Sequence, residues 1–287
     1  MNMQTDITIK PQSNSKLDLV PRIVRFDYSD IQSRNFFSDN PIENAFWAAL
    51  MATFPAGEAE FIHSLNNYKD VIKDKKLLKE MQDFAAQESH HGLQHKKLTK
   101  QLQKAGFALE GVEKVIAERL AERIEGWTPK QRIIRTVCAE HMTAVIGHYG
   151  LSNPESLEQA HDSIRKVLQW HAIEEVEHKS VAFDVYKAAE GDMGALKRDY
   201  ALFLFFVFPI MMTKITRFLL KESGEQVTWA HRWGFFKHLF SLKRGVFGSM
   251  FGHLLAFLKP GFHPWDVDDS ALIESYKKDL APYFANV

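Results

Sequence analysis

The chain has 287 residues, of which 45% are apolar and 25% are charged, a composition typical of a folded protein with a substantial core. Lysine and arginine total 36, as do aspartate and glutamate, and this zero net charge argues against nucleic-acid binding by bulk electrostatics. Cys138 is the single cysteine, which excludes an intrachain disulfide and is typical of a reducing compartment.

The first part of the chain divides into an arm and a series of helices. Residues 1–38 are polar and non-periodic, and we interpret them as an N-terminal arm. They do not begin with a basic stretch and an apolar core, so we expect no secretory signal and a cytoplasmic protein. Asp39-Asn40-Pro41 predicts a helix start, because a capping side chain precedes a proline at the first turn. Helical periodicity and stop signals predict helices at about 41–67, 75–105, 111–125 and 128–149.

The remainder of the chain is also helical in pattern. Asn153-Pro154 begins a segment that stays periodic through Ala189, either as one long helix or as a short helix leading into a long one. Two further helical segments are predicted at about 193–222 and 229–258, separated by Ser223-Gly224. We find no convincing alternating strand and no internal repeat, so the sequence predicts an all-α protein with four or more long helices.

Four of these helices carry acidic and histidine residues in a regular order. A lone glutamate alternates twice with a Glu-x-x-His pair, and residues i and i+3 lie on the same helix face. Each pair can therefore direct one carboxylate and one imidazole to the same point. Four carboxylates and two imidazoles suit two iron or manganese ions, as in ferritin-like di-metal carboxylate proteins. The residues concerned are Glu58, Glu88, His91, Glu140, Glu175 and His178.

Neighbouring residues leave some assignments open. Glu174 and Glu177 compete with Glu175 on the fourth helix, and we favour Glu175. His95 follows Glu88 by seven residues, and we interpret it as a spare ligand, a donor to a ligand or a packing residue. A single Glu-x-x-His is a weak signal, but two of them interleaved with lone glutamates are difficult to obtain by chance.

Four strings of the sequence carry a resemblance to a known family: FPAGEAEFIHSL at 54–65, QESHHGLQH at 87–95, WHAIEEVEHKSVAFDVY at 170–186 and PGFHPWDVDD at 260–269. They resemble the bacterial family described as predicted metal-dependent hydrolases, within the ferritin-like di-metal carboxylate superfamily. This resemblance covers about residues 40–285. The resemblance and the Glu-x-x-His motif together predict a ferritin-like four-helix bundle at 39–190, after an arm at 1–38, with additional C-terminal helices at 191–287 packed on the bundle.

A second resemblance concerns the fourth ligand helix. His171 precedes Glu175 by four residues and His178 by seven, so all three share one helix face. This pattern is similar to the ligand set of the di-iron arylamine N-oxygenases, which carry a third histidine there. The resemblance implies that His171 is a seventh metal ligand, but it covers only the ligand spacing and does not transfer the substrate.

Residues 201–263 form a basic and aromatic region. They contain eight lysines and arginines, two acidic residues and 12 of the 22 phenylalanines. Their uncharged run at 201–212 is shorter than a membrane-spanning helix requires. Three interpretations stay open: core helices packed on the bundle, a surface that lies on a membrane, and the wall of a tunnel for a long apolar substrate. The last two are compatible with each other.

These observations favour one enzyme class over two others. The main hypothesis is a non-haem di-iron oxidase or oxygenase that activates O2 and oxidises an apolar substrate, acyl or lipid-derived. Manganese or a mixed pair suits the same ligands, and an external electron donor is expected because no dinucleotide fingerprint is present. The alternatives are a two-metal hydrolase of an ester or phosphoester and a ferroxidase or iron-handling protein. A homodimer and peripheral contact with the inner face of the membrane are both compatible with the sequence.

Overall fold

The computed structural model describes residues 15–284, and within that range the protein is all-helical apart from one isolated antiparallel bridge between Val24 and Phe284. The prediction of an all-α bundle is confirmed. Residues 1–14 of the predicted arm, on which the expectation about a secretory signal rests, lie outside the described residues.

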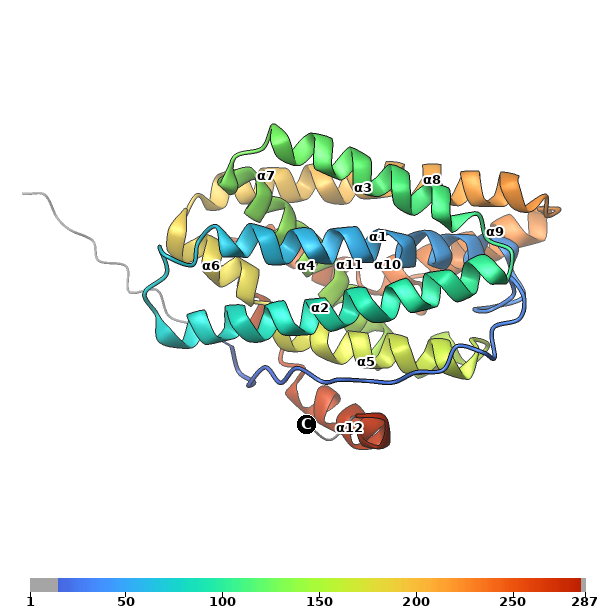
Figure 1. The fold of residues 1–287 in the computed structure, drawn as a ribbon, viewed down its shortest axis with the longest axis horizontal. Coiled ribbons are helices and arrows are strands. Elements are labelled where there is room, and N and C mark those ends of the chain that lie inside the picture. The colour runs from blue at the N-terminus through green and yellow to red at the C-terminus, as the bar shows by residue number, and fades with distance from the viewer. Residues whose placement is uncertain (1–14, 285–287) are drawn as a thin grey trace, which may run out of the picture.

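Four long helices form the bundle (Figure 1): α1 (Pro41–Asn66), α2 (Lys75–Lys104), α4 (Pro129–Ser152) and α5 (Asp162–His178). Contacts join α1 to α2, α4 to α5, α1 to α4 and α2 to α5, so the four helices enclose a common interior. In Figure 1, α2 and α4 run in the same direction because α3 (Leu109–Glu125) carries the chain back along the bundle. One such crossover is the connectivity of ferritin-like folds.

Side-chain caps explain where the bundle helices begin. The Asn40 side chain accepts a hydrogen bond from the Ile42 amide directly before α1. The Asp74 carboxylate accepts from two amides at the start of α2. Thr128 and Gln131 cap α4 reciprocally. Each cap satisfies amides that a helix leaves without intrahelical partners. The three helices begin within one residue of the predicted starts at about 41, 75 and 128.

Two segments differ from the expectation. The stretch from Asn153 divides into a 3₁₀ turn, η1 (Pro154–Leu157), and then α5 and α6 (Val181–Ala189). The predicted helix at 229–258 is wrong, because the chain forms α9 (Trp229–Phe240), α10 (Val246–Ser249) and α11 (Phe251–Ala256). Ser241 is extended, and a Cβ atom at Gly245 or Gly248 would collide with its backbone. This close return of the chain is a tertiary contact that helical periodicity does not encode.

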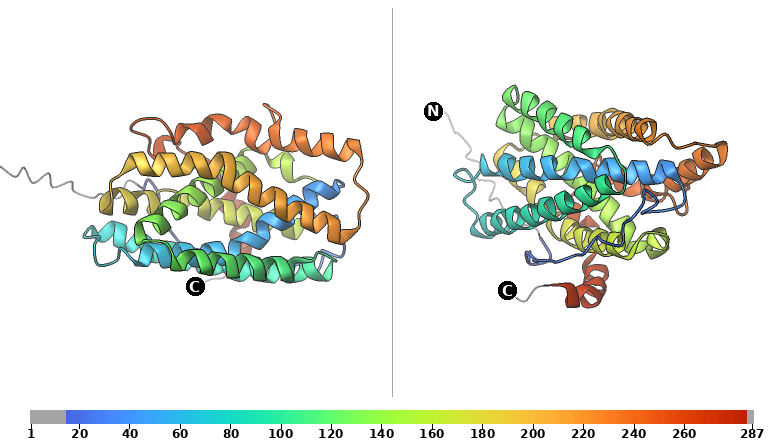
Figure 2. Two further views of the ribbon diagram at one scale, coloured as in Figure 1. Left: turned by 90° about the horizontal axis from the view of Figure 1, so that it is seen from above. Right: turned by 45° about the vertical axis from the view of Figure 1, so that its right-hand side comes forward.

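The remaining segments cover the bundle on two sides. The stretch of α7 (Met193–Leu202), the π-helical turn η2 (Phe203–Val207) and α8 (Phe208–Ser223) is continuous, and α8 packs on α1. Figure 2, left, shows this stretch and the orange-to-red helices after it over one side of the bundle. On another side, residues 15–38 run in an extended form along α5 (Figure 1), and η3 (Pro264–Asp266), α12 (Ser270–Leu280) and η4 (Ala281–Tyr283) follow at the C-terminus.

One helix in the described part of the chain, the stretch Met193–Ser223, is long and apolar enough to cross a membrane by length and composition alone. In its most apolar window of 18 residues, 28% of the residues are buried within the protein. A continuous helix at about 193–222 was expected, and the uncharged run at 201–212 is its central part.

Candidate metal centre

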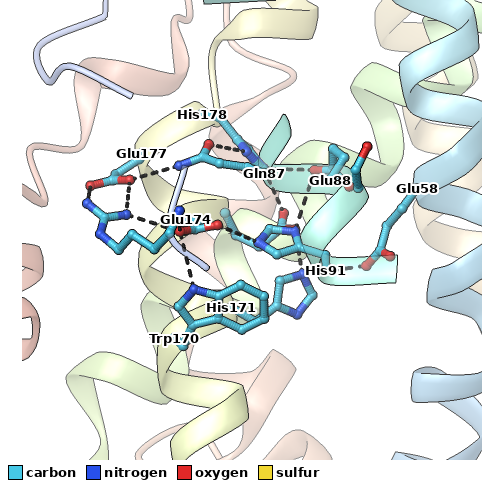
Figure 3. A network of polar contacts seen from close by, with 12 residues as sticks. Glu58, Gln87, Glu88, His91, Trp170, His171, Glu174, Glu177 and His178 are labelled. Carbon is cyan, nitrogen blue, oxygen red and sulfur yellow. Dashed lines mark hydrogen bonds and ion pairs between the residues drawn. The ribbon is translucent and has the colours of Figure 1, made fainter. Parts of the chain in front are cut away.

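All seven predicted site residues lie in the interior of the bundle, and each is at most 4% exposed. They come from four helices, because α1, α2, α4 and α5 each turn the relevant face inward. Figure 3 shows Glu58, Glu88, His91, His171 and His178 directed toward a common centre. The full set is Glu58 from α1, Glu88 and His91 from α2, Glu140 from α4, and His171, Glu175 and His178 from α5.

The polar atoms form two neighbouring groups that meet at Glu175. In the first group, His178 Nε2 lies 3.3 Å from Glu88 Oε1, 3.3 Å from Glu140 Oε2 and 3.4 Å from Glu175 Oε2. In the second, the other oxygen of Glu175, Oε1, lies 2.7 Å from His171 Nε2. The two oxygens of one carboxylate therefore face different groups, which is the arrangement that a bridging carboxylate requires.

The second group also includes residues of α1 and α2. His91 Nδ1 lies 3.7 Å from Glu175 Oε1 and 3.8 Å from Glu88 Oε1. Glu58 Oε1 lies 3.8 Å from His171 Nε2. These separations are too long for hydrogen bonds, so the atoms converge on a shared space without satisfying one another.

Many of these buried atoms have no hydrogen-bond partner. Both carboxylate oxygens of Glu58, Glu88 and Glu140 are buried and unpaired, as are His91 Nδ1 and His178 Nε2. Leaving a buried polar atom without a partner costs about 1–3 kcal/mol, and more for a charged group. Metal ions remove this cost, because carboxylate oxygens and imidazole nitrogens are their ordinary ligands.

Four trios of residues have ligand atoms that all lie within 4.8 Å of one another. Every member of these trios is buried, and the trios overlap, so the donors form one cluster rather than separate sites. We conclude that the cluster fits bound metal ions. The trios are Glu58, His95 and His171; His91, His171 and Glu175; Glu58, Glu88 and His91; and Glu88, Glu175 and His178.

The electrostatics of the cluster also favour bound metal ions. Burial, reinforced by neighbouring carboxylates, raises the pKa of Glu58, Glu88 and Glu140 well above the ordinary value. For Glu175, burial by itself acts to raise the pKa, but interaction with His178 and His171 acts more strongly in the opposite direction. The pKa of Glu175 therefore lies well below the ordinary value. A bound cation would favour the ionised form of all four carboxylates.

Burial likewise lowers the pKa of His91 well below its ordinary value, and the nearby His171 adds to this effect. The imidazole is therefore neutral at pH 7, which is the form that binds a metal. Its Nε2 lies 3.1 Å from Glu174 Oε2. A proton on Nε2, donated to Glu174, leaves the lone pair on Nδ1 directed at the cluster.

His178 is oriented in the same manner from its other side. His178 Nδ1 lies 3.1 Å from Gln87 Oε1, and Gln87 Nε2 donates to Glu177 Oε2 at 3.1 Å. This leaves His178 Nε2 free to face Glu88 and Glu140. Glu177 and Glu174 therefore lie on the outer side of the histidines (Figure 3). Glu175 lies in the cluster, against His171 and His178. Glu175, rather than Glu174 or Glu177, therefore faces the cluster, as predicted.

Arg22 of the extended N-terminal segment holds these two outer carboxylates. Its guanidinium donates to both oxygens of Glu177 at 2.8 Å and to Glu174 Oε1 at 3.2 Å. Trp170 Nε1 also donates to Glu174 Oε1, at 3.2 Å. Burial raises the pKa of Glu174 to about 8, although Arg22 opposes the shift. Sequence reasoning missed Arg22 because it lies in a non-periodic segment and meets partners more than 150 positions away.

His95 belongs to the cluster as well. It is fully buried, and its Nε2 lies 3.1 Å from His171 Nδ1 and 3.6 Å from Glu58 Oε1. Three histidine rings therefore lie close together, since His91 and His171 have ring centroids 4.3 Å apart. Of the three roles considered for His95, these positions are compatible with a ligand or a partner of a ligand.

A cavity of about 50 Å³ reaches the cluster at His171, Glu175 and Thr143. The Thr143 hydroxyl donates a hydrogen bond to Glu175 Oε2. Among the described residues that line this cavity there is no lysine and no arginine. The rest of the lining is largely apolar or glycine: Trp47, Leu50, Met51, Phe54, Ile146, Gly147, Gly150, Leu157, Leu168 and Ala172, with Gln169.

Comparison with known proteins agrees with this centre. The model of the family described as predicted metal-dependent hydrolase matches residues 20–268, which include every residue of the cluster. No curated protein and no solved structure matches the chain. Since the match covers most of the chain, the protein belongs to the family of predicted metal-dependent hydrolases.

Proposed function

We propose that the protein is an O2-dependent di-metal oxidoreductase, with two iron ions as its cofactor, that oxidises an apolar organic substrate. The observation that carries the proposal is the meeting of a carboxylate-rich cluster with an apolar cavity at Glu175 and His171. Carboxylates from four helices with two Glu-x-x-His pairs are the ligand pattern of di-iron carboxylate proteins. Manganese, alone or paired with iron, suits the same donors.

The donor atoms divide between two ions. Glu88, Glu140 and His178 would hold one ion, and Glu58, His91 and His171 the other. Glu175 would bridge them, since its oxygens face different groups. When bound, the ions would supply the redox chemistry that reduces O2, and an external donor would provide the electrons.

The protein's own residues prepare this chemistry. Gln87 and Glu174 each bind one nitrogen of a histidine and so keep the other nitrogen directed at the cluster. Thr143 donates to Glu175 and fixes the rotation of this carboxylate at the cavity. The apolar lining of the space beside the cluster favours an alkyl or aryl substrate.

A second candidate is a two-metal hydrolase, and the family description favours it. Two adjacent metal ions can generate a hydroxide and polarise an acyl group. The lining of the cavity argues for an apolar carboxylic ester rather than a phosphoester, because no cationic side chain lines it within the described residues.

One experiment separates the two candidates. The protein is loaded anaerobically with Fe(II), its metal content is measured, and O2 consumption is followed with apolar amines, acyl chains and esters. We expect about two irons per chain and substrate-dependent O2 consumption. Release of acid from an ester at the same rate without O2 would refute the oxidoreductase and establish the hydrolase.

The seventh donor is tested in the same assay. His171→Ala should lower the iron content or the rate of the O2 reaction at least tenfold. His63→Ala, an exposed histidine on α1, is the matched control and should change neither. Equal behaviour of the two variants would exclude His171 from the site.

A further inference from the structure

Large apolar side chains are exposed over one part of the molecule. Of the eighteen such residues within the described part of the chain, twelve lie between Leu202 and Phe251. Single exposed apolar residues are common on protein surfaces, but a concentration of this kind marks an interaction site. These residues belong to the stretch that includes α8 and α9.

Helix α9 carries the most regular part of this surface. Trp229, Trp233, Phe236 and Phe240 follow one another at spacings of four, three and four, so they lie on one helix face. They are 85%, 59%, 51% and 49% exposed. The Trp233 and Phe236 rings stack at 5.5 Å, and Phe236 and Phe240 are 5.3 Å apart. The aromatic face is thus continuous.

The opposite face of α9 attaches the helix to the bundle. Phe235 packs on Phe46 with ring centroids 5.5 Å apart. The Trp47 indole donates to His238 Nε2 at 3.2 Å, and the Asn40 side chain donates to the His231 carbonyl at 2.9 Å. Because the helix is already held in this way, its aromatic face is not needed for folding.

Positive charge surrounds the aromatic face. Arg232 and Lys237 on α9 and Lys243 and Arg244 directly after it are all exposed, as is Leu242 at 83%. Between Glu225 and Asp266 the chain has no acidic residue. Glu225 itself is paired with Arg34 at 2.7 Å. The surface is therefore cationic as well as aromatic.

Helix α8 lies on the bundle rather than leaving it. Its inward residues Phe208, Met212 and Leu219 are buried, whereas Leu202, Phe206 and Ile210 on the same continuous stretch are exposed. Lys214, Arg217 and Lys221 follow on the exposed side. An amphipathic helix with one packed face and one apolar-basic face suits the plane of a membrane surface better than a path through it.

We propose that residues 229–244, here called the aromatic–basic face, dock on a membrane whose surface carries anionic phospholipids. Tryptophan and phenylalanine enter the interfacial region, while arginine and lysine contact the headgroups. Protein interfaces also contain tryptophan, phenylalanine and arginine, but the charges on this surface have a single sign. Together with the exposed cations of α8 they match an anionic membrane better than a protein partner. The proposal does not depend on the reaction at the metal centre.

Vesicle flotation of the metal-loaded full chain tests the proposal. We expect binding to phosphatidylcholine vesicles that contain 30% phosphatidylglycerol, much weaker binding to pure phosphatidylcholine, and loss of binding as salt rises. Each cation near the membrane surface contributes about fivefold to binding, so Lys237→Gln with Lys243→Gln should weaken binding about 25-fold. Trp233→Ser with Phe236→Ser should weaken it at least tenfold.

The matched control is Leu93→Ser with Val115→Ser, which removes apolar residues that are 52% and 46% exposed elsewhere. It should bind as the unchanged protein does. Circular dichroism and metal content verify that each variant is folded. No binding to anionic vesicles, or equal loss in the control, would overturn the proposal.

Two further measurements identify the surface that docks. Vesicles with brominated acyl chains should quench the tryptophan fluorescence, and Trp229→Phe with Trp233→Phe should remove most of the quenching. Of the other four tryptophans, Trp47, Trp170 and Trp265 are at most 5% exposed and Trp127 is half-buried under Arg135. Binding without quenching would assign docking to another surface. Light scattering that gives a dimer abolished by Trp233→Ser with Phe236→Ser would assign the face to a second copy, and the proposal would be wrong.

Discussion

Replacing Arg22 by methionine should weaken both the fold and the metal centre. Methionine keeps much of the apolar stem but removes the guanidinium that binds Glu174 and Glu177, whose side chains are fully buried. Lys277 contacts Glu177 at 2.8 Å but is 20% exposed and does not replace the lost hydrogen bonds. Breaking a buried ion pair from one side costs about 3–5 kcal/mol. That is a large fraction of the roughly 5–15 kcal/mol that stabilises a domain.

The same change acts on the metal through His91. Arg22 donates to Glu174 Oε1, and the other oxygen of the same carboxyl group, Oε2, lies 3.1 Å from His91 Nε2. Without Arg22 the Glu174 carboxyl group loses the contact that fixes its position, so it no longer orients His91. Loss of such a partner reduces metal affinity about 10- to 100-fold.

Urea denaturation and competitive metal titration measure the two effects. Arg25→Met is the matched control, since Arg25 lies three positions along the same segment and is exposed; it should change the free energy of unfolding by no more than about 0.5 kcal/mol. Adding Glu177→Gln to Arg22→Met should recover part of the lost stability, because fewer unpaired charges stay buried. If Arg22→Met behaves like Arg25→Met in both assays, the assigned role of Arg22 is refuted.

Two further predictions concern helix packing and pH. A Cβ at Gly147 would lie 3.3 Å from the Ala172 backbone, whereas one at Gly150 meets nothing within 4 Å. In urea denaturation, Gly147→Ala should therefore lower the free energy of unfolding by about 1–3 kcal/mol. Gly150→Ala should raise the free energy of unfolding by about 0.5–1 kcal/mol. The reverse order of the two effects would contradict the close approach of α4 and α5. Without metal, the free energy of unfolding should fall as pH rises above about 7.5, because Glu174 and the cluster carboxylates with raised pKa hold protons in the folded state that the unfolded chain has released. Buried histidines with lowered pKa, such as His91 and His95, oppose this fall only at lower pH, where unfolded histidine with its ordinary pKa of about 6.5 still binds protons. A metal-loaded sample should show less of the fall, and a metal-free sample whose stability rises above about pH 7.5 would disprove the explanation.

The sequence predicted what depends on local periodicity. Helix starts at Asn40, Asp74 and Thr128 follow from capping side chains, and the inward placement of each Glu-x-x-His pair follows from the i, i+3 spacing. Other features depend on contacts between distant segments. Arg22 gave no signal of its partners on α5, and the break after α9 arises where Gly245 approaches Ser241. Neither contact leaves a periodic pattern in the sequence from which it could be predicted.

Helix α9 lies between the aromatic–basic face and a residue that lines the cavity at the metal centre. Trp47 lines the cavity that reaches the cluster, and its indole binds His238 on the inner side of this helix. Phe235, also on that side, packs beside Trp47 on Phe46, while the aromatic–basic face covers the outer side. A helix with its side chains is about 10–12 Å across, so docking would bring the bilayer within about one helix diameter of Trp47. The cavity contains no charged side chain other than those at the cluster. A substrate that partitions into the bilayer could then reach the metal centre without crossing bulk water, which favours lipid-like compounds as the first substrates to test.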